Sequence, residues 1–134
     1  MNKIKSDGIV FALVFRFNDS LKEGHNFLTS NEENLQAGII NQKKGHLIDD
    51  HFNHPIERNI YGTQEMMYIE KGRVKIRFLT EIGEIIEEHI LEHGDLAILL
   101  RGGHGFVFLE DSKVIYVKQG PYSGREKDKE NFRK

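Results

Sequence analysis

Most apolar positions of this chain lie in short runs that are separated by polar turns. The longest run, residues 9–17, is apolar and aromatic, which is typical of a strand buried on both faces or lying in an interface. In residues 73–80, Val74, Ile76 and Phe78 share one face and charged residues share the other, which indicates a half-buried strand. Short strands with turns every several residues predict an all-β sandwich or barrel.

Turn residues set the expected boundaries of the remaining elements. The pair Lys71-Gly72 between two apolar runs predicts a tight β-hairpin. Residues 18–34 are polar and are interpreted as a long connection, which could include a short helical turn. Further strands are expected at residues 36–42, 46–51, 65–70, 85–91, 96–100, 104–109 and 113–118.

The chain is expected to form one domain over residues 1–134, because its length suits a single domain and no repeat or linker interrupts it. Residues 124–134 are strongly charged. They are interpreted as a solvated tail, with one short amphipathic helix as the alternative.

Composition removes several classes of function. With 19 Lys and Arg against 21 Asp and Glu, the formal net charge is -2, and the sequence has no basic stripe for nucleic acid. No apolar run is long enough to cross a membrane, and the polar start of the chain does not resemble a signal peptide. Cysteine is absent, so any metal must bind His, Asp or Glu, and a cytoplasmic location is expected.

Two polar residues lie on strand faces that are otherwise apolar. Strand periodicity places Glu65 on the same face as Met67, and His104 on the same face as Phe106. A carboxylate on an inward face is costly unless it is paired or binds a metal. Each of these strand faces is a row of apolar side chains with one polar residue at its end, and we expect a ligand site where the two rows end. The alternative for His104 is that the glycine turn before it only closes a hairpin.

The spacing of these residues resembles the first conserved motif of the cupin family. Gly45, five residues, His51, one residue and Asn53 match the opening of that motif, with Asn in place of its second His. Glu65, six residues and Gly72 match its close. Eleven residues separate Asn53 from Glu65, which is longer than the family's usual spacing.

The second cupin motif is matched further along the chain. Gly94, five residues, Leu100 and then Gly102 follow it, with Leu in place of Pro, and His104 comes one residue early. The resemblance covers residues 36–119 and implies a cupin-type β-barrel, the double-stranded β-helix or jelly roll. Two other segments, residues 63–65 and 117–122, more loosely resemble small cupins of bacterial surface-polysaccharide gene clusters.

A cupin-like site would combine His51, Glu65 and His104, with His54 or Asn53 as the fourth ligand. A bulge at the bend of Asn53, His54 and Pro55 could turn His54 inward; the alternative is that His54 faces solvent or stacks on the proline. Such a set would suit Fe, Mn, Ni or Zn with open positions for water or substrate.

The resemblance suggests an enzyme that isomerises or epimerises a sugar or sugar-nucleotide, with His51 or His104 as the base and a metal or Arg58 holding the oxyanion. A metal-dependent oxygenase using His51, Glu65 and His104 is a second hypothesis. The third is a non-catalytic binding module with a degraded site, which the replacement of a His by Asn53 favours.

Four residues are weaker candidates for ligand contact, and a solvated rim position is the alternative for the charged ones. They are Arg58, Tyr116, Lys118 and Gln119. The partner predicted for the whole chain is a second copy, because residues 9–17 carry more apolar surface than the edge of a small barrel normally exposes.

Overall fold

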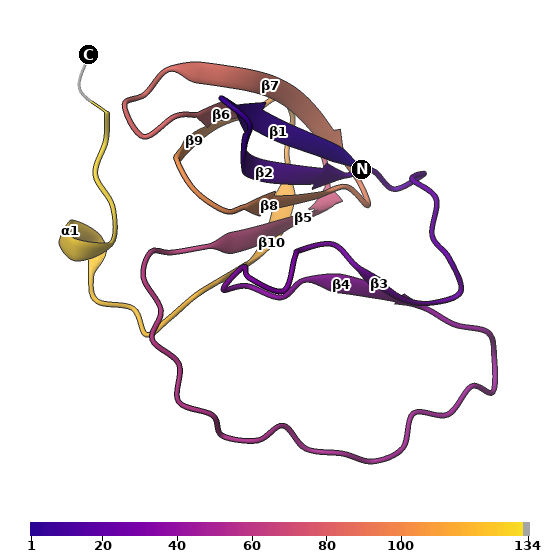
Figure 1. The fold of residues 1–134 in the computed structure, drawn as a ribbon. Helices are drawn as coiled ribbons and strands as arrows, with labels where there is room; N and C mark the ends of the chain where they lie inside the picture. Colours follow the sequence, from indigo (N-terminus) through magenta and orange to yellow (C-terminus); the bar gives the residue numbers. More distant parts are fainter. Residues whose placement is uncertain (133–134) are drawn as a thin grey trace.

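The structure, a computed structural model, describes residues 1–132 and is built mostly of β-strands (Figure 1). Within these residues the only helix is the four-residue α1 (Arg125–Asp128), and no helix is long and apolar enough to cross a membrane. The strands are β1 (Asn2–Ser6), β2 (Ile9–Phe15), β3 (Gly24–Phe27), β4 (Gly38–Asn41), β5 (Glu65–Lys71), β6 (Arg73–Leu79), β7 (Ile85–Glu92), β8 (Leu96–Leu99), β9 (Gly103–Phe108) and β10 (Lys113–Lys118).

Two sheets face one another and hold the main core. One has the order β1-β2-β8-β5-β10 and the other the order β7-β6-β9, with every pair antiparallel. Apolar residues from both sheets form one buried cluster, so the sheets pack face to face as in a sandwich (Figure 1). The all-β prediction is confirmed. In residues 1–132 no sheet closes into a barrel, and the cupin jelly roll stays a prediction.

Strand β6 shows how alternation in the sequence builds this core. Val74, Ile76 and Phe78 are each at most 1% exposed, while Arg73 and Arg77 on the other face are exposed, as the pattern predicts. Burial of such side chains is worth roughly 1.5–3 kcal/mol each, which makes this face a main source of stability.

Strand β2 lies inside the five-stranded sheet, where it pairs with β1 on one side and β8 on the other. Its inner face joins the core between the sheets. On its outer face Leu13 packs against Leu28 and Leu35, so residues 11–15 are buried within their own chain. Most of the apolar surface that suggested a dimer is therefore already covered, although Ile9 and Phe17 at the ends of the run are exposed. The reason given for a dimer is wrong, and the dimer itself stays a prediction.

Three elements differ from the sequence-based expectation. The polar strand β1 was not expected; it is held because Ile4 is fully buried against the core. Strand β3 lies within the segment interpreted as a connection, and it pairs with β4 as a separate hairpin. The strand expected at residues 46–51 is wrong. Residues 42–64 contain no strand and arc away from the sheets (Figure 1).

The turn at Lys71-Gly72 does not make the predicted hairpin. Although β5 and β6 are consecutive, β5 belongs to the five-stranded sheet and β6 to the three-stranded one. Gly72 has a φ of 95°, and at this residue the chain crosses from one sheet to the other. A tight turn between two apolar runs indicates a reversal of direction but not which strands will pair.

Candidate functional site

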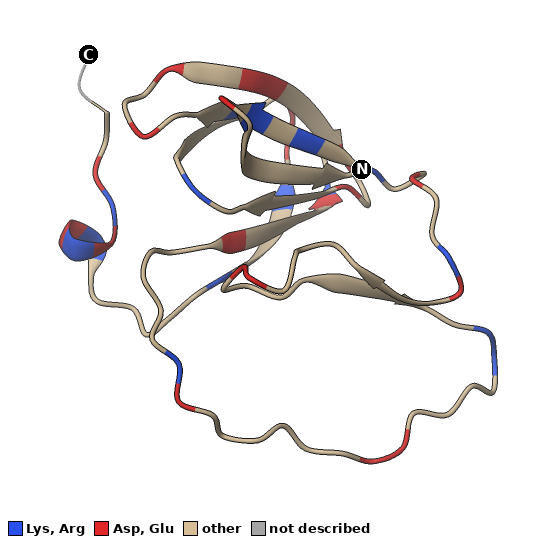
Figure 2. Cartoon of the chain, in the orientation of Figure 1, with Lys and Arg blue, Asp and Glu red and all other residues tan. Residues whose placement is uncertain are grey.

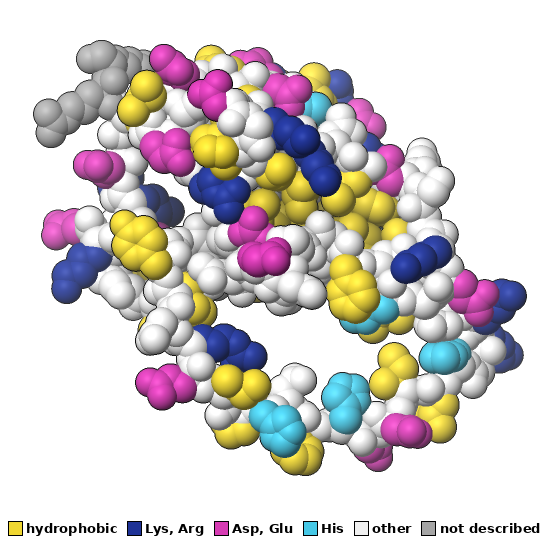
Figure 3. Space-filling view, in the orientation of Figure 1, with side chains coloured by type: hydrophobic (Ala, Val, Ile, Leu, Met, Phe, Trp, Pro, Cys, Tyr) yellow, Lys and Arg dark blue, Asp and Glu magenta, His cyan; other side chains and the backbone are white. Residues whose placement is uncertain are grey.

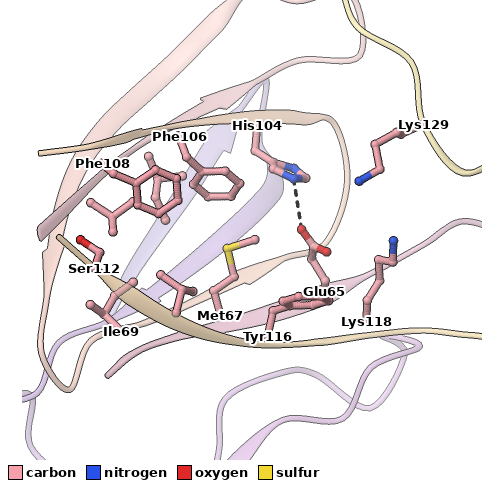
Figure 4. Close-up of a pocket in the computed structure, with 13 residues that line it drawn as sticks. Glu65, Met67, Ile69, His104, Phe106, Phe108, Ser112, Tyr116, Lys118 and Lys129 are labelled. Carbon is pink, nitrogen blue, oxygen red and sulfur yellow. Dashed lines mark ion pairs between the residues drawn. The ribbon is translucent and has the colours of Figure 1, made fainter. Parts of the chain in front are cut away.

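A cavity of about 450 Å³ lies between the two sheets, with one apolar end and one polar end (Figure 4). Strands β5 and β10 supply one wall and strands β6 and β9 supply the other. The apolar part is lined by Met67, Ile69, Val74, Ile76, Phe106, Phe108 and Val114. The polar end is lined by Glu65, His104, Tyr116, Lys118 and Lys129.

Strand alternation places the polar residues there. Glu65 and Met67 are two residues apart on β5, and both line the cavity, as do His104 and Phe106 on β9. The inward direction predicted for both rows is confirmed. Each row therefore runs from an apolar interior to one polar side chain at the open end.

Glu65 and His104 come from opposite sheets and meet at this end of the cavity. The Nε2 atom of His104 lies 3.1 Å from the Oε1 atom of Glu65, and the side chains are 34% and 13% exposed (Figure 4). The ring of His104 also packs against Phe106, with ring centroids 5.3 Å apart. An imidazole in close contact with a carboxylate in a partly dry site is a common device for moving protons.

Lys118 lies beside this pair and is bonded to the C-terminal segment. It is opposite Glu65 in the β10–β5 register, and its Nζ atom lies 2.6 Å from the Oδ2 atom of Asp128. The hydrogen bond to Asp128 raises the pKa of Lys118 above its ordinary value of 10.5 and outweighs burial, which lowers it. The charges of Asp128, Glu65 and Tyr116 raise this pKa further.

We expect the Lys118 ammonium to titrate above 10.5 in the native protein and at a lower pH in Asp128→Asn. A raised folded-state pKa means that the bond to Asp128 stabilises the fold below the unfolded pKa and is lost as pH rises through the folded pKa. The carbon-13 shift of the lysine Cε, followed against pH, measures this. Glu126→Gln, an exposed change two residues away, is the control and should leave the titration unchanged.

Four of the predicted site residues share the cavity: Glu65, His104, Tyr116 and Lys118. Three do not line it. His51, His54 and Arg58 lie on the exposed segment 42–64, and in Figure 3 the arc of this segment is separated from the body by open space. A ring nitrogen of His51 lies 2.9 Å from the carbonyl oxygen of Asp49. The polar contact that the structure describes for His51 is therefore with its own segment and not with the cavity.

The predicted metal set is not assembled. Among residues 1–132, no three His, Asp or Glu side chains lie close enough together to hold a metal ion. Glu65 and His104 supply two donors, and the expected ligands His51 and His54 are elsewhere. These residues as placed do not fit Fe, Mn, Ni or Zn. The metal stays a prediction, and no chemical step below uses one.

Gln119 has a structural role. Its Oε1 atom accepts a hydrogen bond from the backbone N–H of Gln64 at 2.7 Å. The buried Gln64 side chain donates to Glu33 at 2.6 Å and accepts from the backbone N–H of Leu35 at 2.8 Å. Glu33 also pairs with Arg101 at 3.1 Å. These bonds fix the chain just before Glu65 and therefore orient the start of β5.

The sequence reading missed the contribution of the C-terminal segment. Residues 124–134 were interpreted as a solvated tail, with a short helix as the alternative. The structure shows the short helix α1, which brings Asp128 to Lys118 and Lys129 to the cavity; residues 133–134 lie outside the described part. Acidic and basic residues adjoin one another on α1 (Figure 2). This charge pattern gave no signal of which residue would turn inward.

Comparisons with known proteins identify no relative. The chain matches no protein-family model, and no curated protein or solved structure is significantly similar to it.

Proposed function

We propose that the protein is a small-molecule-binding protein of the cupin type that moves a proton on a sugar or sugar-nucleotide ligand. One observation carries the proposal. Glu65, which matches the first cupin motif, and His104, which comes one residue early for the second, meet at 3.1 Å at the polar end of one cavity. A cavity of about 450 Å³ with an apolar interior and a few convergent polar groups is typical of a small-ligand site.

The chemistry that suits this pair is removal of a proton next to a carbonyl group. With Nε2 of His104 next to Oε1 of Glu65, the tautomer that carries its proton on Nε2 has Nδ1 as the proton acceptor. When Nδ1 takes the proton from carbon, the C–H electron pair forms the enediolate and the carbonyl oxygen becomes negative. Glu65 stabilises the imidazolium, and Lys118 supplies positive charge at the same end of the cavity. The proton of the hydroxyl group on the first carbon passes to the former carbonyl oxygen, and return of the carbon-derived proton from Nδ1 to the other carbon completes an isomerisation.

Binding without turnover is the second candidate. The placement of His51 and His54 on the exposed segment 42–64 favours it, because the remaining polar set is small. The oxygenase hypothesis has less support, since it needs His51 beside Glu65 and His104.

We expect the native protein to exchange deuterium from D₂O into a nucleotide-linked 4-keto sugar at the carbon beside the carbonyl, as measured by proton NMR. His104→Gln should slow this exchange by about 10²- to 10⁴-fold, because the general base is removed. Glu65→Gln should also slow it, because an amide cannot balance the imidazolium charge.

His46→Gln is the matched control, since His46 lies on the exposed segment 42–64 and should leave exchange unchanged. His51→Gln should behave in the same way. Equal rates in His104→Gln and His46→Gln would contradict catalysis by this pair. Saturable binding of the sugar with no exchange in the native protein would establish the binding module instead.

A further inference from the structure

The C-terminal segment, residues 124–132, lies across the open end of the cavity. Its residues 128–132 line a second hollow that shares Glu65, His104 and Lys118 with the cavity. Two contacts of the described residues help to hold this segment. One is the bond between Lys118 and Asp128. The other is the ring of Phe132, which lies so close to Gly103 that an added Cβ there would come within 2.6 Å of the ring's Cζ atom.

The bond between Lys118 and Asp128 differs from an ordinary surface ion pair. The two side chains are only 19% and 14% exposed, and the atoms are 2.6 Å apart. The Lys118 side chain lines the cavity beside the bond between Glu65 and His104 (Figure 4). A carboxylate of the protein itself therefore occupies an anion position at the mouth of the ligand cavity.

In the part of the chain that the structure describes, the helix that supplies this carboxylate contributes little to its own stability. Helix α1 has four residues, none of them buried, and no side-chain cap at its start. A helix this short is not stable by itself. Its position therefore depends on the Lys118–Asp128 bond and on Phe132, and a competitor for Lys118 would loosen it.

The charges at this end of the cavity favour such a competitor. Lys118 and Lys129 face the negative charges of Glu65 and Asp128. If Asp128 moves away with the segment, Lys118 loses its anionic partner, and one anionic group of a ligand replaces it. Behind it, Phe106, Met67 and Ile69 offer an apolar wall.

We propose that Lys118 is the anion-binding residue of the cavity, and that Asp128 is an internal occupant which the carboxylate or phosphate group of a ligand replaces. This deepens the proposed function, on which it rests, by giving the ligand class: a sugar or other small molecule that carries a carboxylate or phosphate group beside an uncharged part. Binding of the ligand releases residues 124–132, so the segment is an autoinhibitory contact.

Benzoate and phenyl phosphate are the probes, with neutral benzamide for comparison, and calorimetry measures their affinity. We expect Asp128→Asn to bind both anions about tenfold more tightly than the native protein, because the competing carboxylate is gone. Lys118→Met should weaken both by at least about tenfold, while Lys118→Arg keeps the charge and should bind. Glu126→Gln, on the same helix, should match the native protein. The tighter of the two anions identifies carboxylate or phosphate as the natural group.

Amide hydrogen exchange reports the release of the segment. The N–H groups of Asp128 and Lys129 donate to the carbonyl oxygens of Gly124 and Arg125 within α1. Their exchange should become about tenfold faster when either anion saturates the native protein, and should already be fast in free Asp128→Asn. Benzamide should change neither rate.

Three results would overturn the proposal: no gain of affinity in Asp128→Asn, equal binding of benzamide and benzoate, or slower exchange in α1 with anion bound. The last would mean that the segment closes over the ligand. Failure of the proposed function gives a different result, since anions would then bind and release the segment while the sugar shows no deuterium exchange.

Discussion

Asp95→Ala should lower the free energy of unfolding by about 3 kcal/mol, because it removes a buried carboxylate that three groups share. Asp95 is 6% exposed. It accepts hydrogen bonds from the backbone N–H groups of Phe17 and Glu92 at 2.9 and 2.8 Å, and it pairs with Arg16 at 3.1 Å. These bonds tie the end of β2 to the β7–β8 turn, so both sheets should loosen together.

Urea unfolding followed by circular dichroism measures this change, and the melting temperature should fall by roughly 10 °C. Asp50→Ala removes an exposed carboxylate from the segment 42–64 and should change stability by less than about 0.5 kcal/mol. A loss in Asp95→Ala no larger than in Asp50→Ala would show that the carboxylate is not needed to join β2 to the β7–β8 turn.

Gly72→Ala should also be strongly destabilising, by about 3 kcal/mol. The φ of 95° at this residue disfavours any residue with a Cβ, and the position is closely packed. An added Cβ would lie 2.6 Å from the carbonyl oxygen of Asp111 and would meet the Ser112 side chain. Because that neighbour is backbone, it cannot move without shifting the β9–β10 turn.

Gly45→Ala separates the two causes. Gly45 has a φ of 90°, and an added Cβ there would meet no atom within 4 Å. It should therefore cost only the backbone strain, about 1 kcal/mol. Similar losses in the two variants, measured by urea unfolding, would show that the packing against Asp111 contributes little.

The strands could be predicted where burial follows a simple period. Residues 73–79 alternate so regularly that their inner face was evident, and the buried run of β2 was recognised as a strand. Strand β1 was missed because Ile4 is its only buried apolar residue among polar neighbours. The partners of a strand depend on contacts far apart in sequence, so the pairing of β5 with β8 and β10 could not be read from a local turn.

The candidate site was predictable to the extent that it lies on regular strands. Glu65 and His104 could be found because each ends an apolar row, and the meeting of the two rows follows from the facing of the sheets. His51 and His54 lie on a segment without secondary structure, where spacing in the sequence does not determine direction. Asp128 was missed because its role depends on a tertiary contact made by a charged terminal segment.

The crossing at Gly72 joins β5 directly to β6, and these strands belong to opposite walls of the cavity, so the walls are tied at the apolar end. Glu65 begins β5 at the far end and pairs with Leu99, the last residue of β8. Residues 100–102 then join β8 to β9, which carries His104, so the two sheets are tied by a short link at this end as well. We therefore expect the separation of Glu65 and His104 to vary little as the protein fluctuates. Single cysteines at these two positions, in a chain that has none, would make this separation measurable by paired spin labels.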